Sequence, residues 1–106
     1  MQVEVCAFSI ESCLNAQRAG AQRVELCGGM YEGGTTPSHG LIERARAVLS
    51  IQLYVMIRPR GGDFCYDEEE LAVMRSDIQA AKDLGADGVV FGILQPNGEI
   101  DIAQTA

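Results

Sequence analysis

The chain has 106 residues, of which 47% are hydrophobic and 22% are charged, and its net charge is −7. That balance predicts one globular unit with a small core, and the negative charge argues against a nucleic-acid or anionic-membrane partner. No apolar run approaches the roughly 20 residues of a membrane-spanning helix, and the N-terminus lacks the basic segment of a secretory signal, so we expect a cytoplasmic protein.

The first half of the chain alternates between short β-branched runs and helical patterns. From the N-terminus the pattern predicts a strand at 2–6, a helix that Ser9 caps and that runs to about Ala19, a strand at 23–27, a helix that Ser38 caps, and a strand at 52–57. A loop rich in Gly and Thr precedes the second helix.

The second half continues the same alternation. Asp67 and Glu70 have the spacing of a capping box at the start of the longest helix, which Gly85 ends. A strand at 88–94, a turn at 96–98 and a helix start after Asp101 complete the pattern. The alternation predicts an α/β fold with one parallel sheet and right-handed crossovers. No linker divides residues 1–106, so a single domain is expected.

Two of the predicted strands carry nearly the same residues, VEVC at 3–6 and VELC at 24–27. Because successive side chains of a strand point to opposite faces, the Val and Leu side chains should face the helices. The opposite face then carries Glu4, Cys6, Glu25 and Cys27, and the same parity adds Arg58 after the third strand. Sites in α/β folds form at the carboxyl ends of parallel strands, so a pocket with acids, thiols and one arginine is predicted there.

The two repeated cysteines are the candidate metal ligands. Cys6 and Cys27 should occupy equivalent points of neighbouring strands, about 4.8 Å apart. Two thiolates at that separation suit Cu(I), but two buried thiols without a metal are equally compatible with the pattern. Cys13 and Cys65 lack such a partner, and without a CxxC spacing all four cysteines are expected to be reduced.

The charged residues allow a catalytic and a structural interpretation. Glu4 and Glu25 could share a proton as an acid/base pair, or one could form a salt bridge to Arg58 or Arg23. Arg58 and Arg60, with the glycines that follow, could bind a phosphate or carboxylate.

The loops around the arginines have the same two interpretations. Asp63 could be a base or could organise its own loop. Thr35, Thr36 and the helix start at Ser38 could hold a ligand or could serve only to start the helix. His39, the one histidine, is predicted not to be a ligand.

Several motifs together resemble one known family. VEVC, RVELC, EGGTTPSHG, IRPRGGDFCY, GADGVVFG and NGEID resemble the CutC-type copper homeostasis proteins along the whole chain. The resemblance implies a TIM-like (β/α)8 barrel with its site at the carboxyl ends of the strands. It also implies functional roles at the matching positions, which are Glu4, Cys6, Glu25, Cys27, residues 35–38, Arg58, Arg60 and Asp63.

Four strands are half of the eight that a full barrel needs, so the resemblance implies either a fragment or half-barrels that pair as a homodimer.

The leading hypothesis is copper homeostasis by Cu(I) binding through Cys6 and Cys27. One alternative is an enzyme that binds a small anionic substrate through Arg58, Arg60, Thr35, Thr36 and Ser38 and moves a proton through Glu4, Glu25 or Asp63. The other is a truncated chain that binds no ligand.

Overall fold

The computed structural model describes residues 2–105, and the side chains through residue 103. Four strands form one parallel sheet in the order β1 (Glu4–Ala7), β2 (Arg23–Leu26), β3 (Gln52–Met56) and β4 (Gly88–Val90). Between them lie α1 (Ile10–Arg18), the 3-10 turn η1 (Met30–Glu32), α2 (His39–Val48) and α3 (Glu68–Asp83), and α4 (Ile102–Thr105) follows β4. The predicted α/β fold with alternating parallel strands and helices is therefore confirmed.

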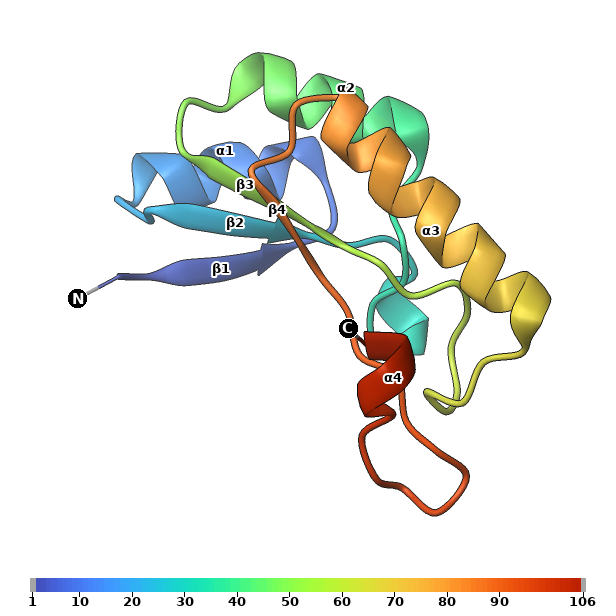
Figure 1. Cartoon of the computed structure of the whole chain (residues 1–106). Coiled ribbons are helices and arrows are strands. Elements are labelled where there is room, and N and C mark those ends of the chain that lie inside the picture. The colour runs from blue at the N-terminus through green and yellow to red at the C-terminus, as the bar shows by residue number, and fades with distance from the viewer. Residues whose placement is uncertain (1, 106) are drawn as a thin grey trace.

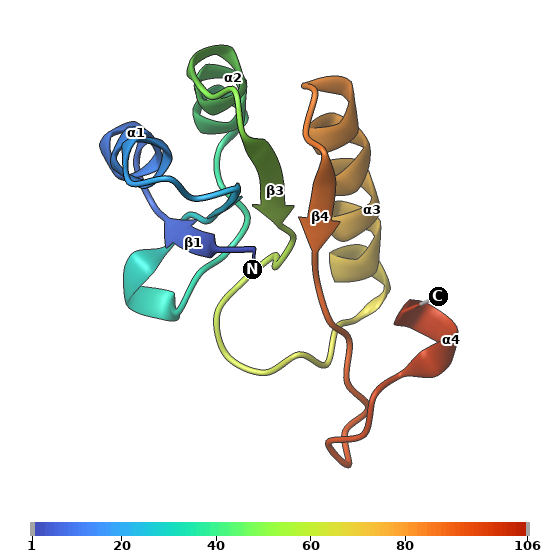
Figure 2. The same cartoon turned by 90° about the vertical axis from the view of Figure 1, so that its left-hand side faces the viewer.

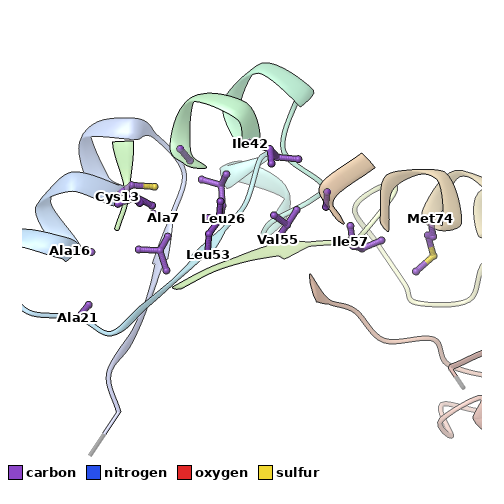
Figure 3. Close-up of a cluster of buried hydrophobic side chains, with 14 of the residues drawn as sticks. Ala7, Cys13, Ala16, Ala21, Leu26, Ile42, Leu53, Val55, Ile57 and Met74 are labelled. Atoms are coloured by element: carbon purple, nitrogen blue, oxygen red, sulfur yellow. The ribbon is translucent and has the colours of Figure 1, made fainter. Parts of the chain in front are cut away.

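Helices α1, α2 and α3 cover one face of the sheet, and α4 lies apart from them (Figures 1 and 2). The core lies between these helices and the sheet, as Figure 3 shows. Among its largest fully buried side chains are Val24 and Leu26 of β2, Leu53 and Val55 of β3, and Ile57, which directly follows β3. These are the positions that the alternating pattern assigned to the helix side, so the predicted strand parity is correct for β2 and β3.

The helix starts follow the predicted caps. The Ser9 hydroxyl accepts a hydrogen bond from Ser12 N, and the Ser38 hydroxyl accepts one from Leu41 N, both at 3.1 Å. Asp67 and Glu70 form the full capping box of α3. Such caps satisfy backbone N–H groups that the first helical turn leaves without partners.

The last strand differs from the prediction. A strand was expected over 88–94, but β4 ends at Val90. Beyond it Leu94 N donates to Phe64 O and Leu94 pairs with Ile100 in an antiparallel bridge. The residues after Val90 are thus held by backbone bonds to the β3–α3 loop and to the following turn, and Ile93 is buried in the core.

An ion pair ties the amino ends of β3 and β4, away from the carboxyl ends. Asp87 Oδ2 accepts hydrogen bonds from Leu53 N and from Arg46 Nη1, both at 2.8 Å. The other terminal nitrogen of Arg46 donates to the carbonyls of Leu49 and Ile51 at 2.9 Å. This network fixes the connection between α2 and β3.

Asp87→Asn is expected to lower the free energy of unfolding by about 1 kcal/mol at neutral pH, since it removes a charge-assisted, partly exposed pair. The backbone N–H of Leu53 and the Arg46 guanidinium lower the pKa of Asp87. Its stabilising effect is thus present above the unfolded pKa of about 3.9 and is lost as the pH falls through the lower folded value. Denaturant unfolding should show a difference between the two proteins at pH 7 that disappears in acid. A difference that persists in acid would contradict this role.

Candidate metal centre

The polar side chains that the strand parity places away from the core lie on the open face of the sheet. Cys6 is exposed, Glu25 is half-buried, and Cys27, which directly follows β2, is only 1% exposed. The Sγ atoms of the two cysteines and a carboxylate oxygen of Glu25 all lie within 4.8 Å of one another. Within residues 2–105 this is the one group of three potential metal ligands, and His39 lies exposed at the start of α2.

The strand register corrects one expectation about the cysteines. Cys6 lies beside Glu25 and Ala7 lies beside Leu26, so Cys6 and Cys27 are not at equivalent points of β1 and β2. The repeated motif has a spacing of 21 residues, whereas the pairing of Glu4 with Arg23 has an offset of 19. The two offsets differ by two residues, so the strand pairing staggers the repeated motifs relative to each other. The thiols still meet, because Cys27 reaches diagonally across the open face.

The environment of the thiols disfavours their free thiolate forms. Burial raises the pKa of Cys27 to about 12, with further contributions from Cys6 and Glu25. Burial and the nearby Glu25 carboxylate also raise the pKa of Cys6. The raised pKa values favour the protonated form of both thiols at neutral pH, and Cys27 Sγ lies 3.9 Å from the Glu25 carbonyl oxygen and 4.0 Å from Glu25 Oε1.

A loop residue covers one of the two sulfurs. Gly34 has φ +103°, and a Cβ at this position would lie 3.6 Å from both Cβ and Sγ of Cys27. The β2–α2 loop reaches this place because Gly28 and Thr35 exchange two backbone hydrogen bonds of 2.8 Å. Cys27 is thus enclosed by its own loop, whereas Cys6 is open to solvent.

A layer of side chains closes the open face toward the amino ends of the strands. The Glu4 carboxylate pairs with Arg23 Nε at 2.5 Å, and the Arg23 guanidinium lies 4.3 Å from the centre of the Tyr54 ring. The Tyr54 ring in turn packs on Gly88, where a Cβ would come within 2.7 Å of it. This layer crosses all four strands. It lies next to the cluster of Cys6, Glu25 and Cys27, on the side of the amino ends of the strands. Sequence reasoning raised the Glu4–Arg23 pair as one alternative but not the part played by Tyr54 and Gly88.

Glu25 differs from Glu4 in its surroundings. Burial raises the pKa of Glu25, and a hydrogen bond and like charge from Glu4 raise it further. Glu25 makes no ion pair with any described residue, while Glu4 is paired with Arg23. The two glutamates are therefore close, as expected, but Arg23 serves only Glu4 as a direct counter-ion.

Arg58 is buried, with 9% of its surface exposed, and its guanidinium joins two loops. One terminal nitrogen donates to the carbonyls of Glu32 and Gly34 at 2.8 and 2.9 Å, and the other donates to the Gly62 carbonyl at 2.8 Å. The guanidinium also lies 4.8 Å from the centre of the Phe64 ring. Three of its five N–H groups thus hold loop backbone, while Nε is buried and has no hydrogen-bond partner among the described residues.

Other predicted ligand-binding residues are engaged in local structure. The Thr36 hydroxyl accepts from Arg58 N at 2.8 Å and lies 3.1 Å from Arg58 O. The Ser38 hydroxyl caps α2, and the backbone of Thr35 pairs with that of Gly28 in an antiparallel bridge. These contacts favour the structural interpretation of residues 35–38, and ligand binding by them stays a prediction.

Arg60 and Asp63 organise the β3–α3 loop. Arg60 Nε donates to Glu70 Oε2 at 2.5 Å, and other donors of Arg60 reach the carbonyls of Asp63 and Cys65. The Cys65 backbone N–H and the Arg60 guanidinium lower the pKa of Asp63, which is the wrong direction for a general base near neutrality. Substrate binding by Arg60 and proton transfer by Asp63 also stay predictions.

The arrangement defines a class of protein. Four parallel strands in sequential order, with the helices on one face of the sheet (Figure 1), are the arrangement from which (β/α)-barrel proteins are built. A crystal structure of (S)-3-O-geranylgeranylglyceryl phosphate synthase from Thermoplasma acidophilum shares this fold, with a TM-score of 0.52 and 21% identity over 92% of this chain and 30% of that one.

The chain belongs to the CutC family, whose model matches residues 1–106. It is 62% identical over 102 residues to a CutC family protein of Bacteroides thetaiotaomicron and 54% identical over 99 residues to the human copper homeostasis protein cutC homolog. The crystal structure of CutC from Streptococcus agalactiae superposes with a TM-score of 0.92 at 41% identity and covers 99% of this chain.

This chain spans less than half the length of the curated relatives it matches. The matches cover 95% of this chain but 41% of the Bacteroides protein, and 93% of this chain but 36% of the human protein. In the Streptococcus structure the match covers 52% of the chain. None of the helices within residues 2–105 is long and apolar enough to cross a membrane.

Proposed function

We propose that this chain takes part in cytoplasmic copper homeostasis by holding Cu(I) between the thiolates of Cys6 and Cys27. The observation that carries the proposal is that their sulfur atoms lie within 4.8 Å of each other at the carboxyl ends of neighbouring strands. Cu(I) is a soft ion that prefers thiolates. Two metal–sulfur bonds of about 2.3 Å span up to about 4.6 Å, so small side-chain rotations would bring both sulfurs onto one ion.

The family supports the same proposal. Relatives from human and mouse carry the name copper homeostasis protein. Copper here is a cargo, and the exposed Cys6 gives it a route to the enclosed Cys27.

We further propose that two chains pair through the edge strands β1 and β4, since unpaired edges of a parallel sheet are otherwise exposed.

The test is an anaerobic titration of the reduced protein with Cu(I) against a competing chelator. We expect one copper per chain, or one per chain pair, and loss of this binding in the Cys6→Ser/Cys27→Ser double variant. Cys65→Ser, which removes a half-buried loop thiol outside the cluster, should bind like the parent. Light scattering on the same samples measures the mass of the species. Copper binding that survives in the double variant would overturn the proposal, and a monomer mass would overturn the pairing.

A second candidate function is an enzyme that uses Glu25 to move a proton. The raised pKa of Glu25 favours it, since a carboxyl group that titrates nearer neutrality is a better acid and base. Arg58, the main anion-binding group of that hypothesis, uses three of its five N–H groups to hold loop carbonyls, which makes the hypothesis weaker than the copper proposal. Copper handling therefore remains the function that the geometry supports best.

A further inference from the structure

The carboxylate of Glu25 stands beside the two thiols as a third donor. It comes from β2, next to Cys6 in the strand register and two residues before Cys27 on the same face. We propose that Cys6, Glu25 and Cys27 form a three-donor site that also takes a divalent cation of the zinc type. This proposal rests on the same thiol pair as the proposed copper function, but it concerns a different ion and a residue that Cu(I) does not need.

The first argument for the three-donor site is the chemistry of its donor atoms. Two thiolates satisfy Cu(I), which accepts low coordination numbers, and a carboxylate oxygen is a hard donor that Cu(I) has little use for. Zinc is a borderline ion that binds sulfur and carboxylate oxygen together, usually with four ligands. A set of two sulfurs and one oxygen is thus better matched to zinc than to Cu(I).

Charge carries the second step. Two thiolates and one carboxylate bring three negative charges to a half-buried place, so a divalent ion leaves a net charge of −1 and a monovalent ion leaves −2. The alternative counter-charge, Arg23, is already paired with Glu4. The neighbour of the Glu25 carboxyl group is the Glu4 carboxyl group, and Glu25 has no direct ion pair among the described residues, so a bound cation would be its counter-ion.

Geometry carries the third step. The three donor atoms lie within 4.8 Å of one another, and sulfurs on a tetrahedral zinc ion, with bonds of about 2.3 Å, lie about 3.8 Å apart. Side-chain rotations of about 1 Å would therefore complete three of the four zinc bonds. The exposed side of Cys6 leaves the fourth position open to water or to a ligand from another molecule.

The test uses Co²⁺ alone as a spectroscopic substitute for Zn²⁺, added without oxygen to the reduced full chain. We expect one Co²⁺ per site, with a sulfur-to-cobalt charge-transfer band and the visible bands of a tetrahedral ion, and displacement by Zn²⁺. Glu25→Gln should weaken Co²⁺ binding at least tenfold and should change Cu(I) affinity by a much smaller factor. Glu25→Asp, which keeps a carboxylate, should retain more Co²⁺ affinity than Glu25→Gln, and circular dichroism checks that both variants fold.

The outcomes separate this proposal from the copper function. A chain that binds Cu(I) but no Co²⁺, or a Glu25→Gln variant that leaves Co²⁺ affinity unchanged or weakens both ions equally, would overturn the three-donor site and leave copper handling intact. A chain that binds Co²⁺ through Glu25 but not Cu(I) would support the three-donor site and overturn the copper function. Binding of neither ion would overturn both.

Discussion

Replacing either Cys6 or Cys27 alone by serine is expected to lower Cu(I) affinity by at least about 100-fold, or about 2.7 kcal/mol. Serine offers a hard, neutral oxygen in place of a soft thiolate, and a single remaining sulfur cannot complete a two-coordinate Cu(I) site. The structure gives no reason for the variants to misfold, because Cys6 is exposed and serine nearly preserves the volume of Cys27. Chelator competition measures the affinity of each single variant.

The double variant supplies the decisive control for this prediction. If both sulfurs hold the same ion, the losses are not additive, and the double variant should be little weaker than either single variant. Cys65→Ser should remain within about twofold of the parent, since Cys65 lies outside the donor cluster. Additive losses, or a strong effect at only one cysteine, would mean that the two thiols do not share an ion.

Arg58→Ala is expected to lower the free energy of unfolding by about 3–5 kcal/mol. The substitution leaves the carbonyls of Glu32, Gly34 and Gly62 without their donors and removes the contact of the guanidinium with the Phe64 ring. Hydrogen bonds from charged donors contribute about 1.5–3 kcal/mol each and are not additive, and buried acceptors left without partners cost more than the bonds alone. Denaturant unfolding gives the value if the transition is two-state.

Arg75→Ala is the matched control for Arg58→Ala. Arg75 is an exposed residue of α3 without a hydrogen bond or ion pair to a described residue, so its removal should change stability by less than about 0.5 kcal/mol. Equal, small effects at both positions would show that Arg58 does not hold the loops together and would return it to the anion-binding interpretation.

Much of the fold followed from local sequence signals. Ser9, Ser38 and the Asp67–Glu70 box mark helix starts because their side chains satisfy backbone groups a few residues away. Strand parity was equally predictable, since the alternation of Val24, Glu25 and Leu26 assigns the faces with no knowledge of neighbouring strands.

The features that were not predictable depend on residues far apart in the chain. The stagger that sets Cys6 beside Glu25 depends on how neighbouring strands pair, which no single strand encodes. The role of Arg58 depends on how two separate loops fold over it. The sequence contains only a weak indication that Gly34 covers Cys27. That indication is the pair Gly33 and Gly34, because glycines allow the positive φ angles that the loop needs.

The unequal exposure of the two cysteines has a consequence for how a thiolate-bound cargo leaves the protein. In the proposed Cu(I) complex, an acceptor molecule would meet the exposed Cys6 before the enclosed Cys27, so the first bond that it exchanges would be the one to Cys6. The bond to Cys27 would then break last, and access to it would depend on movement of the loop at Gly34, which the Arg58 guanidinium holds in place. The order of ligand exchange would therefore be fixed by the fold, and the lifetime of the loaded state would depend on loop opening more than on the strength of either sulfur bond.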